Sequence, residues 1–243
     1  MRAVTLILSL LLFSVVTQGK NEKTENKPKP IEPVKWLNNL DKSVSDKRLD
    51  ISTLNYYQIP KDIDFRGIVV EAIKWKDSEG DKILVQSITG QYEAKEYGID
   101  SISYTMQDRS ELLVYLFLKR AGEEEYTKAW KYSDINDCFG FDWYTGFISH
   151  ATTITDLDDD GISEITFPYV LICHTKKEVG DMKIVMYEGK DRYEVSGNTT
   201  IDCSNANPNN GVFTKSEKLN YRPVFADFLK KRWNLHQCEK GRF

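Results

Sequence analysis

Short apolar runs dominate the chain from Phe65 onward, and they predict β-strands. The run Leu112–Leu118, LLVYLFL, is apolar at every position, which is typical of a central strand covered on both faces. Turns rich in Asp, Glu, Lys and Gly separate the runs, so neighbouring strands are expected to pair as antiparallel hairpins. The predicted strands are Ile68–Val70, Lys82–Ile88, Ile102–Met106, Leu112–Leu118, Tyr126–Tyr132, Thr152–Ile154, Ile162–Cys173, Met182–Tyr187 and Tyr193–Val195. Pro168 interrupts the longest of them, which suggests an edge strand or a bulge.

One helix is predicted near the C-terminus. Pro223 suits the first turn of a helix, and apolar residues follow it at helical spacing. These residues are Phe225, Phe228, Leu229 and Trp233. The stripe indicates a helix that packs on a sheet rather than one that lies on a membrane surface. The pattern therefore predicts a mainly β (α+β) fold, with an antiparallel sheet, hairpins and one C-terminal helix.

A sequence of elements occurs twice along the chain: an acidic turn with glycine, a strand, a connection and a hairpin. The glycines of the two turns are Gly80 and Gly161. We interpret this repeat as a sign of internal duplication. Two units are too few to close a β-propeller, so either a two-sheet domain or a single curved sheet is expected.

Residues 1–19 have the layout of a secretory signal peptide. Arg2 precedes an apolar stretch, Ala3–Val16, and the small residues Thr17 and Gly19 stand at the −3 and −1 positions of a cut after Gly19. An uncleaved membrane anchor is the alternative, and the short apolar stretch disfavours it. The chain is therefore expected to be exported to the periplasm, the cell surface or the medium.

The rest of the chain predicts one folded domain behind a spacer. Residues 20–35 are polar and rich in Pro and Lys, which indicates a linker. Residues 36–243 are expected to form a single β-rich globular domain, because 40% of the chain is apolar. No later stretch is apolar enough for a transmembrane segment in the mature chain. The formal net charge of −4, without a basic run, argues against nucleic acid as a partner.

The four cysteines, Cys138, Cys173, Cys203 and Cys238, form no CxxC pair. In an oxidising compartment they indicate two disulfides, for which three pairings exist. We favour Cys138–Cys173, which flank one block of predicted strand, with Cys203–Cys238 tying back the C-terminal segment. Free buried thiols are the alternative. A metal site of Cys173 and His174 is disfavoured, because neighbours in a strand point to opposite faces.

Residues 156–164 follow the pattern D-x-D-x-D-G-x-x-E. Ca²⁺ takes six or more oxygen ligands, and alternate acidic residues of a tight loop can all turn inward. Gly161 allows the sharp bend of such a loop. The candidate ligands are the side chains of Asp156, Asp158, Asp160 and Glu164 and the carbonyl of Ile162. A solvated acidic turn that binds nothing is the alternative.

The loop is not an EF-hand, because position 12 is Phe167 and a strand pattern follows. It resembles the β-hairpin calcium loops of FG-GAP and VCBS-type repeats and, more loosely, those of dockerins. Glu164 stands where those loops more often have Asp. The resemblance implies the same ligands, with Ca²⁺ as the cofactor. The earlier acidic turn, Asp77–Gly80, is expected to hold no ion.

A wider resemblance covers the stretch from Asp137 to Gly197. It is carried by Thr155–Asp158 with Gly161, and then by Asp181–Ile184 and Met186–Gly189. The stretch is similar to a family of exported bacterial proteins, mainly from the Bacteroidetes group, described as surface polysaccharide biosynthesis proteins. The resemblance implies a role in making or displaying a cell-surface glycan, with no known reaction and no catalytic residues to transfer.

No motif of a nucleophilic, metal-hydrolase or nucleotide-binding enzyme is present in the sequence. The first hypothesis is therefore a non-catalytic, Ca²⁺-stabilised accessory or binding protein of the cell envelope, whose partners are a surface glycan or envelope proteins. The second is a hydrolase or transferase that acts on envelope polysaccharide through an Asp/Glu pair. Aromatic residues between 130 and 144 suggest either a sugar-stacking surface or, as we favour, core packing.

Overall fold

The computed structural model describes residues 39–138, 143–173, 180–200 and 213–238. All of them belong to one compact unit, Trp36–Phe243. The predicted signal peptide and the predicted linker lie outside the described residues. Among the described residues, no helix combines the length and apolar character needed to cross a lipid bilayer.

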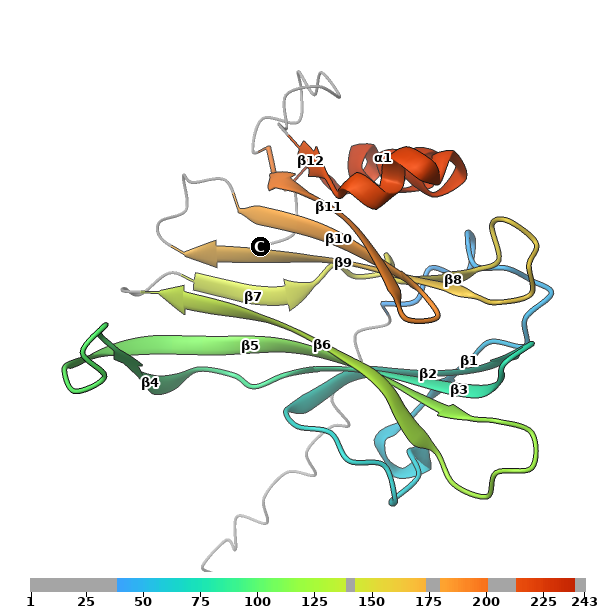
Figure 1. Ribbon diagram of the computed structural model, residues 1–243, viewed down its shortest axis with the longest axis horizontal. Coiled ribbons are helices and arrows are strands. Elements are labelled where there is room, and N and C mark those ends of the chain that lie inside the picture. Colours follow the sequence, from blue (N-terminus) through green and yellow to red (C-terminus); the bar gives the residue numbers. More distant parts are fainter. Residues whose placement is uncertain (1–38, 139–142, 174–179, 201–212, 239–243) are drawn as a thin grey trace, which may run out of the picture. The chain divides into compact units, whose positions relative to one another are not determined.

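Two antiparallel sheets of six strands each form the body of the described chain (Figure 1). In the first sheet the order is β1-β2-β3-β5-β4. β3 and β4 pair with different parts of one edge of β5, and β6 pairs with the other edge. Its strands are β1 (Ser52–Leu54), β2 (Ile68–Asp77), β3 (Gly80–Ile88), β4 (Tyr92–Tyr97), β5 (Tyr104–Lys119) and β6 (Thr127–Cys138). A short 3-10 helix, η1 (Tyr56–Gln58), precedes β2.

In the second sheet the order is β12-β11-β10-β9-β7, and β8 also pairs with β9. Its strands are β7 (Trp143–Phe147), β8 (Thr153–Thr155), β9 (Glu164–Cys173), β10 (Asp181–Glu188), β11 (Asp191–Asn198) and β12 (Phe213–Lys215). A 3-10 helix, η2 (Glu217–Tyr221), leads into the helix α1 (Pro223–His236). The prediction of a mainly β fold with one C-terminal helix is confirmed.

Both faces of each sheet are covered over its central strands, which explains why several of these strands lack polar alternation. The sheets pack on each other through a core that includes Trp75, Leu112 and Phe167. Helix α1 covers the other face of the second sheet through Phe225, Leu229 and Trp233. The segment before β2 covers the other face of the first sheet through Ile59 and Ile63. The predicted central strand Leu112–Leu118 lies within β5 and is buried at every position.

The two sheets share one pattern of connections. Four antiparallel strands pair in chain order as β2-β3-β5-β6 in the first sheet, where β4 is inserted between β3 and β5, and as β8-β9-β10-β11 in the second. Such a match is what an internal duplication would leave, and the common origin of the two halves stays a prediction. The two glycine-containing turns lead into the second strand of each set of four.

A disulfide joins the two sheets at one end. Cys138 ends β6 and Cys173 ends β9, and their Cα atoms are 5.4 Å apart. This pairing was predicted and is confirmed, and it removes Cys173 as a metal ligand. The second predicted pair includes Cys203, which lies outside the described residues, so the Cys203–Cys238 pairing stays a prediction.

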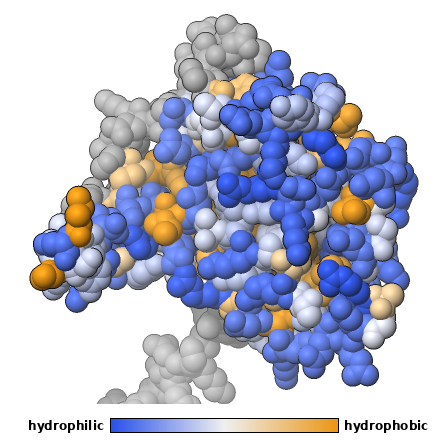
Figure 2. All heavy atoms as spheres, viewed as in Figure 1, coloured by the Kyte–Doolittle hydropathy of each residue, from blue (hydrophilic) through white to orange (hydrophobic). Residues whose placement is uncertain are grey.

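The face of the molecule in Figure 2 is mostly hydrophilic. The clearest exception is the end of the projection at the left, where hydrophobic colour gathers. Figure 1 places the hairpin of β4 and the start of β5 in this projection.

Candidate metal site

The acidic loop predicted to bind Ca²⁺ joins β8 to β9 in the second sheet. The loop is tight because two of its residues, Asp159 (φ 59°) and Gly161 (φ 84°), have left-handed backbone conformations. The amide of Ile162 donates a hydrogen bond to Asp160 Oδ1 at 2.7 Å, which holds the second half of the turn. Glu164 follows as the first residue of β9.

The loop brings predicted ligands together in two groups that share Asp158. One carboxylate oxygen from each of Asp156, Asp158 and Glu164 can be chosen so that all lie within 4.8 Å of one another. The same holds for Asp158, Asp160 and Glu188. Glu188 ends β10 and was not predicted, because it lies outside the loop in the sequence. Both groups consist of side chains, so a role for the Ile162 carbonyl stays a prediction.

Glu164 is the buried member of the first group, with 0% of its surface exposed. Its Oε2 accepts hydrogen bonds from the Leu157 amide at 2.9 Å and the Thr155 hydroxyl at 3.0 Å. Its Oε1 and the Oδ1 of Asp156 are buried without a hydrogen-bond partner. Burial raises the pKa of Glu164 to about 7, and the charge of Asp158 acts in the same direction.

A buried carboxylate oxygen without a partner is unfavourable, and a cation held between the three carboxylates of the first group would give both of these oxygens a partner. Ca²⁺ prefers hard oxygen ligands, and charged carboxylates are the strongest of them. The groups present therefore fit a divalent cation bound by Asp156, Asp158 and Glu164, with Asp160 and Glu188 beside it.

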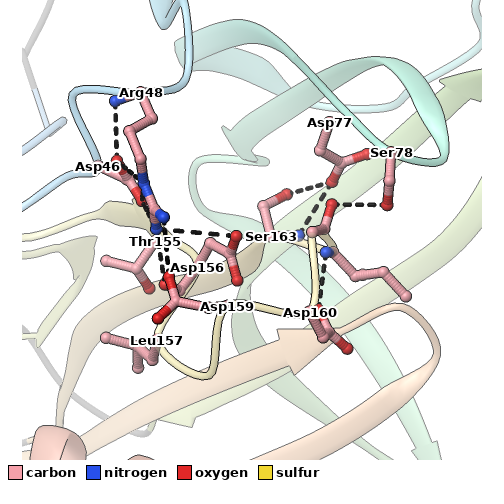
Figure 3. Close-up of polar contacts among 12 residues, drawn as sticks. Asp46, Arg48, Asp77, Ser78, Thr155, Asp156, Leu157, Asp159, Asp160 and Ser163 are labelled. Carbon is pink, nitrogen blue, oxygen red and sulfur yellow. Dashed lines mark hydrogen bonds and ion pairs between the residues drawn. The ribbon is translucent and has the colours of Figure 1, made fainter.

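Two arginines hold the loop to the rest of the molecule. Arg48 forms ion pairs with Asp46 at 2.6 Å and with Asp159 at 2.8 Å, on one side of the loop (Figure 3). Arg222, the residue before α1, pairs with Asp158 at 2.7 Å and also with Glu188. Arg48 also lies 3.8 Å from Asp156 Oδ2, so the arginines offset part of the negative charge, while Asp156 Oδ1 and Glu164 Oε1 keep no hydrogen-bond partner among the described residues.

The loop also rests on the β2–β3 turn of the first sheet. The amide and hydroxyl of Ser78 donate to the Gly161 carbonyl at 3.0 and 2.6 Å. In return, the amide and hydroxyl of Ser163 donate to Asp77 Oδ2 at 3.0 and 2.5 Å (Figure 3). The two turns compared in the sequence thus contact each other and link the two sheets.

At this second turn the positive charge is supplied by the protein. Lys82 Nζ lies 2.6 Å from Asp77 Oδ2 and 2.6 Å from Glu79 Oε2, and the whole lysine is buried. Burial alone would raise the pKa of Asp77, but hydrogen bonds from Lys82 and Ser163 outweigh it, so the pKa lies below its ordinary value. The expectation that no ion binds at this turn stays a prediction.

The aromatic residues between 130 and 144 that the structure describes mostly serve the core. Trp130 stacks on Tyr187 with ring centroids 4.0 Å apart, and Tyr132 is buried against Phe167. Tyr144 is partly exposed. Phe139 and Phe141 lie outside the described residues.

Two shallow grooves lie on the second sheet: one of about 500 Å³ is lined by β6 and by β9 to β12, and one of about 390 Å³ is lined by β11, β12 and the residues after β12. The larger groove has a mixed lining, with polar residues such as Asp134, Lys183 and Asn198 beside the apolar residues Ile135, Leu171 and Met182. The two carboxyl groups whose pKa is raised to about 7, Glu71 and Glu164, line neither groove. The described grooves thus lack the shifted carboxyl pair that glycan hydrolysis uses.

Comparison of the chain with models of known protein families, with curated proteins and with solved structures finds no match in any of the three.

Proposed function

We propose that this chain is an exported, non-catalytic accessory or binding protein of the cell envelope, stabilised by Ca²⁺ in its acidic loop. The observation that carries the calcium site is the buried Glu164 Oε1, which has no hydrogen-bond partner and lies in one group with Asp156 and Asp158. Export is supported by the pattern of residues 1–19. The link to a surface glycan is supported by the resemblance over Asp137–Gly197.

The ion would act on stability because of where its ligands come from. Asp156 and Asp158 belong to the β8–β9 loop, and Glu164 belongs to β9. Asp158 also pairs with Arg222 at the start of α1, so a loop held by an ion would keep the helix in place. A ligand that binds only the folded protein raises its stability by mass action.

The proposal predicts a calcium-dependent gain in stability. For a site of the weak, extracellular kind, about 10 mM Ca²⁺ should raise the free energy of unfolding by about 1–3 kcal/mol relative to EDTA. Asp158→Asn should abolish this gain, because Asp158 belongs to both groups of carboxylates. Thermal or urea unfolding of each protein in EDTA and in Ca²⁺ measures the effect.

Asp159→Asn is the matched control. Asp159 lies in the same loop, belongs to neither group and has a side chain that is 73% exposed; its partner Arg48 keeps its contacts with Asp46 and Asp156 when Asp159 is replaced. This variant should keep the full calcium-dependent gain, although its stability in EDTA can change. A wild-type protein with equal stability in EDTA and Ca²⁺ would leave the loop as an acidic turn and remove the metal from the proposal.

A further inference from the structure

The β4–β5 hairpin forms a two-stranded arm that lacks support from a third strand along β4. β4 pairs with residues 104–109 of β5, while β2 begins at Ile68, opposite Ile88 of β3. Among the described residues, no strand therefore pairs with the outer edge of β4. Isolated two-stranded hairpins are marginally stable in water, and unpaired edges accept strands from other chains.

The arm also exposes several large apolar side chains to solvent, which is unfavourable for a hairpin without a partner. At its tip Ile99 is fully exposed and Ile102 is 82% exposed. The register pairs Tyr97 with Tyr104, and both side chains are more than half exposed on one face of the arm. Figure 2 shows the hydrophobic colour at the end of this projection. Exposed apolar surface concentrated in this way indicates a partner.

We propose that the partner is a second copy of this chain, which pairs its β4 with β4 in an antiparallel, twofold-symmetric arrangement. In such a sheet, directly opposite residues share a face, so the twofold axis passes through one residue of β4. An axis at Ala94 places Glu93 opposite Lys95 of the partner subunit, and the symmetry repeats this pair. Opposite charges in directly opposed positions stabilise a strand pair.

The neighbouring registers are unfavourable. An axis at Lys95 would place this lysine opposite its own copy, and an axis at Glu93 would do the same for the glutamate. β4 ends at Tyr97, and continuing the Ala94 register past this end directs Ile99 of the partner subunit toward the base of the arm, where Ile68 pairs with Ile88. Ile68 is 68% exposed at the start of β2, so apolar surface at the tip of one arm meets apolar surface at the base of the other.

A lipid surface fits the arm less well than a second copy does. The carboxylate of Asp100 lies between the two exposed isoleucines and accepts hydrogen bonds from the Ile102 and Ser103 amides and from the Ser103 hydroxyl. Hydrogen bonding by Ser103 and Ile102 lowers the pKa of Asp100, which keeps a negative charge at the tip. Insertion of that charge into a bilayer is costly.

The test is a charge-swap cycle on self-association. Glu93→Lys and Lys95→Glu each place like charges opposite each other across the dimer. Each should therefore raise the dissociation constant of the dimer about tenfold or more at low ionic strength. The double variant E93K/K95E restores opposite charges and should recover wild-type association within about threefold. Sedimentation velocity of the protein purified after export measures the dissociation constants.

A second pair of substitutions tests the tip. Ile99→Ser with Ile102→Ser should weaken association while leaving the circular-dichroism spectrum of the fold unchanged, because both side chains are exposed. A wild-type protein that stays monomeric at about 100 µM, or single charge swaps that leave the dissociation constant unchanged, would overturn the proposal. A monomer that co-sediments with phosphatidylcholine vesicles through these isoleucines would also overturn it. This test does not depend on Ca²⁺ binding.

Discussion

Replacing Lys82 by Met is expected to lower the free energy of unfolding by about 3–5 kcal/mol. Lys82 is completely buried, and its ammonium group is within 2.6 Å of the carboxylates of Asp77 and Glu79. Without the ammonium group, Oδ2 of Asp77, whose side chain is equally buried, would keep only the hydrogen bonds from Ser163. The cost comes from leaving a charge buried and unpaired, and methionine fills most of the space of the lysine side chain.

The substitution should also loosen the acidic loop, because Asp77 accepts the hydrogen bonds that hold Ser163 in place. Ser163 in turn accepts a hydrogen bond from Trp75 Nε1 at 2.8 Å in the core between the sheets. Urea unfolding at constant pH measures the change. The matched control is Lys74→Met on the neighbouring strand β2, where the lysine is exposed, and it should change stability by about 0.5 kcal/mol or less.

A further variant separates lost charge pairing from lost packing. Lys82→Met combined with Asp77→Asn removes both charges, and the asparagine oxygen can still accept from Ser163. The double variant should therefore be more stable than Lys82→Met alone. If the single lysine variant unfolds with wild-type stability, the buried ion pair does not hold the two turns together.

The clustering of the acidic loop could be predicted from the sequence because its carboxylates are close together along the chain. Asp156, Asp158, Asp160 and Glu164 lie within nine consecutive positions, so spacing alone suggests that they meet. The other charged residues that contact these carboxylates come from segments distant in the sequence. Glu188 reaches the loop from β10 and Arg222 from the start of α1, and only the sheet order brings them there.

The second half of β5 could be predicted for a similar reason, but its first half was predicted as a separate strand, Ile102–Met106, and β4 was not predicted. A run of apolar residues covered on both faces has a clear sequence pattern, but β4 reads YEAKEY and is exposed along most of its length. Its strand character comes from pairing with the first half of β5. A pattern of apolar residues in the sequence cannot reveal a strand whose side chains are almost all exposed.

Pro168 led to a wrong expectation for a physical reason. Proline lacks an amide hydrogen, so its position suggested an edge strand or a bulge. β9 is instead an inner strand, with β10 on one side and both β7 and β8 on the other. β8 pairs with residues 164–166 and β7 with residues 169–173, so Pro168 falls in the gap between them. An interior proline is tolerated where no neighbouring strand needs its missing amide hydrogen.

Glu71 should make the protein less stable as the pH rises towards neutrality. The residue is 5% exposed, Oε1 accepts a hydrogen bond from the Leu40 amide at 3.1 Å, and Oε2 is buried without a partner. Burial raises its pKa from the ordinary 4.5 to about 7, although the amides of Leu40 and Asn39 oppose the shift. The folded protein therefore keeps a proton that the unfolded chain loses between these two pH values.

The sign of the pH dependence follows from proton binding. Where the folded state binds more protons than the unfolded state, stability falls as pH rises, here by up to about 3 kcal/mol between pH 4.5 and 7. Glu71→Gln removes this titration and keeps an oxygen that can accept from Leu40. At pH 8 the variant should be more stable than the wild type by about 2–3 kcal/mol, and at pH 4.5 the two should agree within about 1 kcal/mol.

Urea unfolding of both proteins in EDTA, from pH 4.5 to 8, measures this difference. The pKa of Glu164 is raised in the same direction, but Glu164 is present in both proteins, so its contribution cancels in the comparison. Glu124→Gln, at an exposed position in the β5–β6 turn, should follow the wild-type curve at every pH. Parallel curves for the wild type and Glu71→Gln would mean that Glu71 ionises in the folded protein as it does in the unfolded chain.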